Sequence, residues 1–177
     1  LGTARIAKMI GPEKQREFLT SIGFAKPTSI EIIEAKVGKP LLPKQWNELE
    51  TMTISYGHGM SITPLHLAAG YAMLANGGRL VKPTLLEDVK SNLGPRVVSK
   101  EVADASLAML RGVVMDGTAS IADISGYFVG GKTGTADKPS AQGGYDKEKN
   151  ITSFASIFPI NDPKYVLVVT LDEPQDT

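Results

Sequence analysis

The stretch Gly126-Tyr-Phe-Val-Gly-Gly-Lys-Thr-Gly-Thr-Ala136 decides how the second half of this chain folds. Its aromatic and β-branched residues favour a strand over a helix, and from this point the apolar pattern has a period of two. Two more such stretches follow, separated by the turn-forming residues Asn161-Asp162-Pro163. The sequence therefore predicts three strands, at residues 127–136, 151–158 and 165–171, and the last two should form a hairpin.

The segment between the first two strands, residues 137–150, is polar and has no helical pattern. A parallel crossover would need a helix there, so we expect an antiparallel meander with helices packed on its faces. This is an α/β (α+β) sandwich with an antiparallel sheet flanked by helices. Segment 137–150 itself is interpreted as a loop that either gates a neighbouring site or is merely disordered.

The chain before residue 126 is expected to be mainly helical, within a single domain that spans residues 1–177. Helices are predicted at residues 2–10, from Pro12 to a stop at Gly23, at 64–76 with Thr63 as the cap, and from Ser99 to about 115 with Gly117 as the stop. Residues 25–50 are expected to be a loop, and residues 79–84 a short extended segment. The last helix should pack through an apolar stripe of Val102, Met109, Leu110 and Val113.

Composition and charge exclude several classes of function. Lys plus Arg and Asp plus Glu both number 19, so the formal net charge is 0, which argues against nucleic acid as a partner and against a polybasic membrane-surface role. The chain has no cysteine, which excludes disulfides, thiolate metal sites and cysteine nucleophiles. Its two histidines, His58 and His66, do not form a metal-ligand pair. We expect no metal and no cofactor.

One motif in this stretch suggests a nucleotide-binding loop. Residues Gly126 to Thr133 satisfy the pattern G-x-x-x-x-G-K-[ST], and the adjacent acidic residues Asp172 and Glu173 follow an apolar strand, as the magnesium-binding acids of such enzymes do. Such a loop must open directly into a helix that holds the phosphates. The residues after Thr133, which include Gly134 and Pro139, are a poor helix start, so this P-loop hydrolase interpretation is an alternative and not the preferred one.

The preferred interpretation takes Lys132-Thr133-Gly134 as the K-T-G element of the serine acyltransferases that penicillin inhibits. A lone K-T-G triplet is weak evidence. Other stretches of the chain, however, accompany it in a consistent order. They are Tyr56-Gly-His-Gly-Met-Ser-Ile-Thr-Pro-Leu65, Arg111-Gly-Val-Val-Met-Asp-Gly-Thr-Ala119, Ser153-Phe-Ala-Ser-Ile-Phe-Pro-Ile-Asn-Asp-Pro163 and Leu171-Asp-Glu-Pro174.

Together these stretches closely resemble the transpeptidase domain of class B penicillin-binding proteins, and most of all the cell-division (septal) peptidoglycan D,D-transpeptidase of Gram-negative bacteria. The resemblance implies acyl transfer from the D-Ala-D-Ala end of a stem peptide through a serine ester, and covalent inhibition by β-lactams. It implies that peptidoglycan stem peptides, β-lactams and cell-division membrane proteins are the partners. It also implies an inner-membrane anchor with this domain in the periplasm.

The resemblance implies the following roles for site residues. Lys132 supplies positive potential, and the backbone N–H of Thr135 is one donor of the oxyanion hole. Thr133 and Thr135 hold the carboxylate of the substrate through their hydroxyls, and Gly134 permits the close approach of the helix that carries the nucleophile. His58 is expected at the rim of the cleft, touching ligands, or merely as a turn residue, and His66 is expected to serve packing.

Two elements of the family, Ser-x-x-Lys with the nucleophile and Ser-x-Asn, do not occur in these 177 residues. The chain begins with Leu1 in a helical pattern, so we expect it to be cut from something larger, and we expect the activity to belong to the intact protein. A second alternative is a non-catalytic relative that senses cell-wall fragments or β-lactams.

Overall fold

The computed structural model of the chain describes residues 1–28, 30–34, 38–87, 92–140 and 144–175. Its main sheet contains β3 (Gly130–Pro139), β4 (Tyr145–Phe158) and β5 (Tyr165–Asp172) in the order β3-β4-β5. Both pairs of neighbouring strands are antiparallel, with Lys132 opposite Ala155 and Ala155 opposite Val168. The predicted meander is confirmed, and so is the hairpin between the last two strands.

The first strand differs from the prediction at both ends. It begins at Gly130 rather than at residue 127, because Phe128 has a φ of 50°, which lies outside the range of a strand. It then runs on to Pro139, and β4 begins as early as Tyr145. The pairing of the two strands shifts register between Asp137, which lies opposite Asn150, and Lys138, which lies opposite Asp146. The interpretation of residues 137–150 as a loop is therefore wrong for the described part, most of which is a β-hairpin; residues 141–143 lie outside the described residues.

The four predicted helices are confirmed as α1 (Gly2–Ile10), α2 (Pro12–Ser21), α4 (Pro64–Ala75) and α5 (Lys100–Asp116). Their starts follow from capping, because the side chain of Thr63 accepts a hydrogen bond from the backbone N–H of His66 and that of Ser99 accepts one from Val102. The predicted apolar stripe of α5 is only partly correct. Ala103 and Val114 are its fully buried residues, whereas Val102 and Met109 are exposed.

Three elements were not predicted. The end of the expected loop at residues 25–50 enters α3 (Glu48–Ile54), whose cap is Asn47: its side-chain oxygen accepts a hydrogen bond of 2.8 Å from the N–H of Leu49. The extended segment at residues 79–84 contains β1 (Arg79–Val81), which pairs with β2 (Leu93–Arg96). A short 3₁₀ turn, η2 (Ser120–Ala122), also follows α5.

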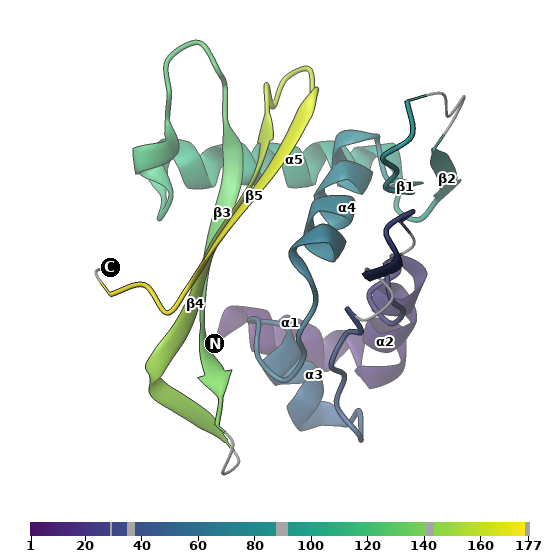
Figure 1. Cartoon of the computed structure of the whole chain (residues 1–177), viewed down its shortest axis with the longest axis vertical. Coiled ribbons are helices and arrows are strands. Elements are labelled where there is room, and N and C mark those ends of the chain that lie inside the picture. The colour runs from purple at the N-terminus through teal and green to yellow at the C-terminus, as the bar shows by residue number, and fades with distance from the viewer. Residues whose placement is uncertain (29, 35–37, 88–91, 141–143, 176–177) are drawn as a thin grey trace.

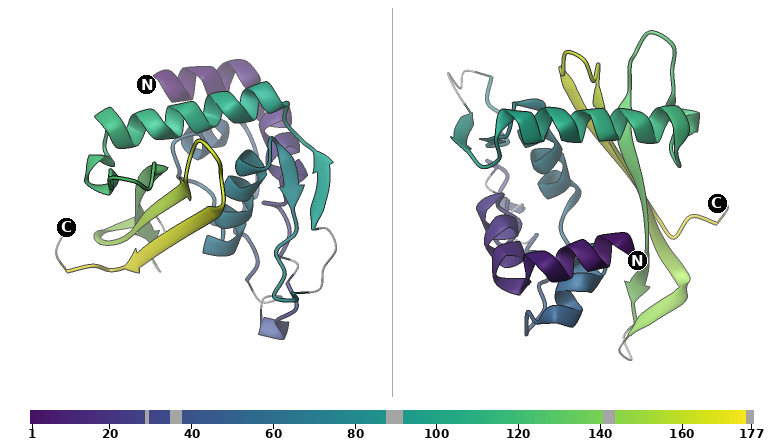
Figure 2. Two further views of the ribbon diagram at one scale, coloured as in Figure 1. Left: turned by 90° about the horizontal axis from the view of Figure 1, so that it is seen from above. Right: turned by 180° about the vertical axis from the view of Figure 1, so that it is seen from behind.

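Helix α4 stands between the β1–β2 hairpin and the three-stranded sheet, while α1, α2 and α3 pack against one another at the end of the molecule away from α5 (Figure 1). Helix α5 crosses the sheet and packs along β3, as the view from behind shows (Figure 2). A core of Val114, Ala119 and Val129 joins α5 to the three-stranded sheet, with Phe154 and Phe158 packed against it. In the described part of the chain, no helix is long and apolar enough to cross a membrane.

Candidate active site on strand β3

The Lys-Thr-Gly-Thr segment lies in the first half of β3, which forms one edge of the sheet among the described residues. Lys132, Gly134 and Thr135 are exposed, and Thr133 is half-buried. A P-loop would need a helix to begin after Thr133, and here the strand continues for six more residues, to Pro139. The nucleotide-binding alternative for residues 126–133 is therefore wrong.

The ammonium group of Lys132 lies against the next residue. Its Nζ atom donates hydrogen bonds to the carbonyl oxygen of Thr133 at 2.7 Å and to the Oγ1 atom of Thr133 at 3.3 Å. The N–H and C=O of one strand residue point to the same side, and so do those of the residue two positions on. The N–H of Thr135 therefore points to the same side as the Thr133 carbonyl, which is the side that Lys132 reaches.

Three glycines of β3 have different surroundings. A Cβ atom at Gly130 would approach the side chain of Ile160 to 2.6 Å, and one at Gly131 would approach the ring of Phe154 and the carbonyl oxygen of Ala155 to 2.7 Å each. Both positions therefore need glycine for packing. A Cβ atom at Gly134 would meet only the Oγ atom of Ser153, at 3.7 Å, so the described residues leave room for a side chain at this position.

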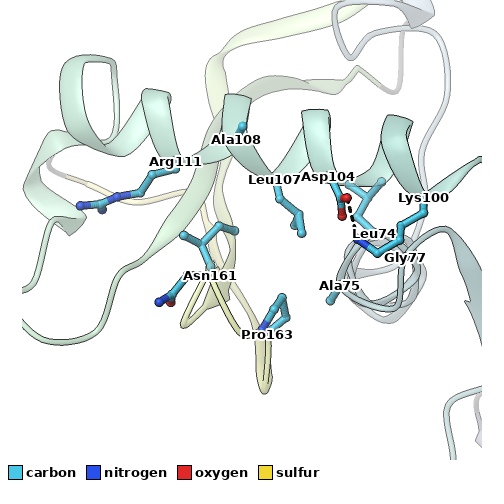
Figure 3. A pocket seen from close by; sticks show the side chains of 11 residues that line it. Leu74, Ala75, Gly77, Lys100, Asp104, Leu107, Ala108, Arg111, Asn161 and Pro163 are labelled. Atoms are coloured by element: carbon cyan, nitrogen blue, oxygen red, sulfur yellow. Dashed lines mark hydrogen bonds and ion pairs between the residues drawn. The ribbon is translucent and has the colours of Figure 1, made fainter.

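The segment that leads into β3 is fixed to α5 by Arg111. Its Nη1 atom donates hydrogen bonds of 2.8 Å to both a carboxylate oxygen of Asp123 and the carbonyl oxygen of Val129. Figure 3 shows the Arg111 side chain pointing away from the ion pair of Lys100 and Asp104, which lies at the start of the same helix. Between them lies a cavity of about 480 Å³ enclosed by α4, α5 and the β4–β5 turn. Arg111 thus holds the start of β3 in position.

His58 lies near the far end of the Lys-Thr-Gly-Thr segment. Its ring contacts those of Tyr56 and Tyr145, with centroids 5.6 and 5.3 Å away, and the hydroxyl of Tyr145 accepts a hydrogen bond of 3.1 Å from the N–H of Gly59. His58, Gly59 and Tyr145 border a cavity of about 240 Å³ that Ala136, the residue after Thr135, also lines. The Nδ1 atom of His58 is buried and has no hydrogen-bond partner among the described residues. His58 is therefore placed beside the strand that carries the other predicted site residues.

His66 and the carboxylates at the end of β5 have structural partners. The Nε2 atom of His66 lies 2.7 Å from the carbonyl oxygen of Lys26, and its Nδ1 atom lies 2.7 Å from the hydroxyl of Thr63. The Nζ atom of Lys138 donates to Glu173 at 2.8 Å and to Asp172 at 2.9 Å. The hydrogen bond to Glu173, and after it the one to Asp172, raises the pKa of Lys138 above its ordinary value of 10.5.

Sequence reasoning did not single out two side chains near this segment. Tyr145 lies in what was expected to be a loop. Thr118 lies inside the quoted stretch from Arg111 to Ala119, and its hydroxyl is 3.1 Å from that of Thr133. Thr118 follows the glycine that ends α5, a local signal that could have drawn attention to it, but the sequence alone does not indicate which residue it contacts.

The whole chain, residues 1–177, matches the family model described as the penicillin binding protein transpeptidase domain. The chain belongs to this family. A protein of Caulobacter vibrioides named "Probable peptidoglycan D,D-transpeptidase FtsI" is 33% identical to it over 186 residues, which cover 99% of this chain and 31% of that protein. The chain spans about a third of the length of the curated relatives that it matches.

Solved transpeptidase domains of the same family share the fold. The apo transpeptidase domain of penicillin-binding protein 3 from Burkholderia pseudomallei superposes with a TM-score of 0.88 at 37% identity, covering 98% of this chain and 53% of that one. Penicillin-binding protein 3 from Mycobacterium tuberculosis, in complex with aztreonam, gives a TM-score of 0.84 at 30% identity, covering 98% of this chain and 43% of that one. The expected fold, an antiparallel sheet flanked by helices, is that of penicillin-binding transpeptidase domains.

Proposed function

We propose that the full-length protein is a serine-type peptidoglycan D,D-transpeptidase that acts in septal cell-wall synthesis and is covalently inhibited by β-lactams. The observation that carries the proposal is the Lys-Thr-Gly-Thr segment on an exposed edge strand, in a chain that belongs to the transpeptidase family. The names of the relatives support the reaction, and the aztreonam complex of one structural neighbour supports the inhibitor class.

The reaction consists of two acyl transfers. A serine hydroxyl attacks the carbonyl carbon between the two D-alanines of a stem peptide, forms an ester and expels the terminal D-alanine as an amine that takes up a proton. An amine of a neighbouring stem peptide then attacks the ester, forms the cross-linking amide and returns the proton to the serine. The Ser-x-x-Lys and Ser-x-Asn elements of the family, which supply the nucleophile and a neighbouring serine, are absent from these 177 residues.

The residues of β3 would act on the charges of the donor peptide. The N–H of Thr135 points to the same side as the Thr133 carbonyl that Lys132 contacts, and there it would stabilise the oxyanion that forms on the attacked carbonyl. The hydroxyls of Thr133 and Thr135 would hold the terminal carboxylate of the donor. Lys132, beside Thr133, adds a positive charge that strengthens this binding.

His58 would bind the donor peptide farther along the strand. It borders the cavity of about 240 Å³ that begins at Ala136, and its Nδ1 atom is buried without a partner among the described residues. A substrate that extends beyond Thr135 would enter this cavity alongside the contacting rings of His58 and Tyr145.

The experiment that tests this function measures labelling of the full-length protein by a fluorescent penicillin. Lys132→Ala should slow acylation roughly 10- to 150-fold, because a hydrogen bond to a charged group contributes about 1.5–3 kcal/mol. Lys164→Ala is the matched control, since Lys164 is an exposed lysine that pairs with Asp162 at the β4–β5 turn. Equal labelling of both variants at the unmodified rate would refute the role of Lys132.

A second measurement separates the enzyme from a non-catalytic sensor that also binds β-lactams. A transpeptidase releases D-alanine from a D-Ala-D-Ala donor peptide when an acceptor amine is present, whereas a sensor is labelled by penicillin without such turnover. Release of D-alanine that is abolished by penicillin supports the enzyme. Labelling without release supports the sensor.

We further propose that the full-length protein is anchored in the inner membrane, with this domain in the periplasm, and acts together with cell-division membrane proteins. This part of the proposal rests on the resemblance to septal transpeptidases. Depletion of the protein should block division and give filamentous cells. Cells that instead lose their rod shape would assign the protein to elongation.

A further inference from the structure

Thr118 occupies a rigid position at the end of α5. The residue before it, Gly117, ends the helix so tightly that a Cβ atom there would lie 2.7 Å from the carbonyl oxygen of Val113. The residue after it, Ala119, is 1% exposed and belongs to the buried core with Val114. The backbone on both sides of Thr118 is therefore fixed, although its own side chain is exposed.

The fixed side chain of Thr118 reaches β3. Its Oγ1 atom lies 3.1 Å from the Oγ1 atom of Thr133, fifteen residues farther along the chain. The same Thr133 oxygen accepts the hydrogen bond of 3.3 Å from the Nζ atom of Lys132. The Thr133 hydroxyl is thus held between a group on its own strand and a group on the segment after α5.

The number of protons in this cluster limits how it can bind an anion. A hydroxyl has one proton to donate and two lone pairs that accept. Lys132 has no lone pair and can only donate, so it takes up one lone pair of Thr133. If Thr118 donates its proton to the second lone pair, the Thr133 proton remains free for a ligand. A carboxylate, which only accepts, requires this arrangement.

We infer that Thr118 is a positioning residue of the carboxylate site: its hydroxyl donates to Thr133 and directs the Thr133 proton toward the terminal carboxylate of the donor peptide or β-lactam. Hydrogen bonds in such a chain polarise one another, so the Thr118 contact also makes Thr133 a stronger donor. The inference rests on the proposed function and adds to it a residue that acts through Thr133 and not on the ligand itself.

The test uses pairs of variants in the full-length protein that differ by one hydroxyl. Thr118→Val removes the hydroxyl and keeps the shape, and Thr118→Ala and Thr118→Ser differ from each other only in the hydroxyl. The rate of acylation by a fluorescent penicillin should fall about five- to tenfold in the Val and Ala variants, as expected for one neutral hydrogen bond, and recover in the Ser variant. If Thr118→Val does not fold, the Ala and Ser variants decide alone.

A double-mutant cycle separates positioning from a structural role. If Thr118 acts through Thr133, then Thr118→Ala should have no further effect in a Thr133→Val background, where the shared hydroxyl is gone. A structural role of Thr118 would instead give the same loss in both backgrounds, and the inference would be wrong. It would also be wrong if Thr118→Ala acylates at the unmodified rate. A full-length protein that no penicillin labels at all would overturn the proposed function and this inference together.

Discussion

The two edges of the three-stranded sheet, β3 and β5, have similar geometry and opposite chemistry. Phe154 on β4 pairs with Thr133 on one side and with Val169 on the other, so these two residues are equivalent positions on the two edges. On β3, buried glycines lead into the exposed polar residues Lys132 and Thr135. On β5, one face exposes only apolar side chains in the strand, namely Tyr165, Leu167, Val169 and Leu171.

The two edges can therefore make different kinds of interaction. The exposed side chains of Leu167, Val169 and Leu171 on β5 offer apolar area and no donor or acceptor, so their contribution is through packing. The side chains and peptide groups of β3 offer donors at an accessible strand edge, which is where an extended peptide can add to a sheet. Changes on β3 should therefore alter acylation, and changes on β5 should not.

The largest effect is expected where a backbone N–H is removed. Thr135→Pro deletes the N–H proposed for the oxyanion hole and should slow penicillin acylation of the full-length protein roughly 100- to 1,000-fold. Thr135→Ala keeps this N–H and loses only the hydroxyl, so its effect should be much smaller. Proline is tolerated at strand edges where the N–H faces outward, and a thermal melt would check that the variant folds. Equal losses in the two variants would count against the main-chain role.

The second largest effect is expected when the equivalent positions Thr133 and Val169 on the two edges are exchanged for each other's residue type. Thr133→Val and Val169→Thr are isosteric exchanges on either side of Phe154. Thr133→Val should slow acylation roughly 10- to 150-fold, because it removes a hydrogen bond to a carboxylate. Val169→Thr should leave the rate unchanged, since Val169 lies on the opposite edge of the sheet and is separated from Thr133 by β4. Stopped-flow acylation rates of both variants measure this, and a slow Val169→Thr variant would break the contrast between the edges.

A smaller effect separates packing from function within β3. Gly131→Ala should lower the free energy of unfolding by about 1–3 kcal/mol, because the new methyl group would press on Phe154 and the Ala155 carbonyl. Gly134→Ala, which meets only Ser153 at 3.7 Å, should change that free energy by no more than about 0.5 kcal/mol. It should nevertheless slow acylation, since Gly134 is proposed to permit a close approach. Denaturant unfolding and labelling rates, measured on both variants, would reveal a reversed pattern.

The smallest effect concerns Lys138, which links β3 to the end of β5. Its pKa is raised in the folded protein by Glu173 and Asp172, so its pairing stabilises the fold at pH values below the ordinary pKa of 10.5 and is lost as the pH rises through the raised pKa. The difference in unfolding free energy between the unmodified protein and Lys138→Met should therefore stay constant from pH 7 to about 10 and shrink above that. Lys149→Met is a suitable control, as Lys149 lies 3.8 Å from Glu173. A difference that grows with pH would contradict the assignment.

Much of the fold could be predicted because its signals are local. Thr63 with Pro64 starts one helix and Asn161-Asp162-Pro163 turns one hairpin through neighbouring residues alone. The β3–β4 hairpin could not be predicted in this way. Its residues are polar, and they become strand through distant partners, such as Asn150 opposite Asp137 and the carboxylates that bind Lys138. Helix α3 was missed although Asn47 is a good cap, since the helix has only seven residues.

In the candidate site, too, the residues that are adjacent in sequence could be predicted, and their long-range contacts could not. Lys132, Thr133, Gly134 and Thr135 are consecutive, so a motif indicates them together, and their place in a strand follows from the residues around them. The contacts that surround them span long stretches of sequence. Thr118 meets Thr133 across the end of α5, and the Tyr145 hydroxyl meets Gly59 across 86 residues. No pattern of spacing predicts such pairs, because they depend on how the helices pack against the sheet.

The apolar face of β5 has a practical consequence for handling the protein. A sheet edge that exposes Leu167, Val169 and Leu171, in a chain whose formal net charge is 0, has little to keep two copies apart. Preparations of these 177 residues alone should precipitate as their concentration rises. A lysine in place of Val169 should keep them in solution, which would make the isolated stretch accessible to spectroscopy.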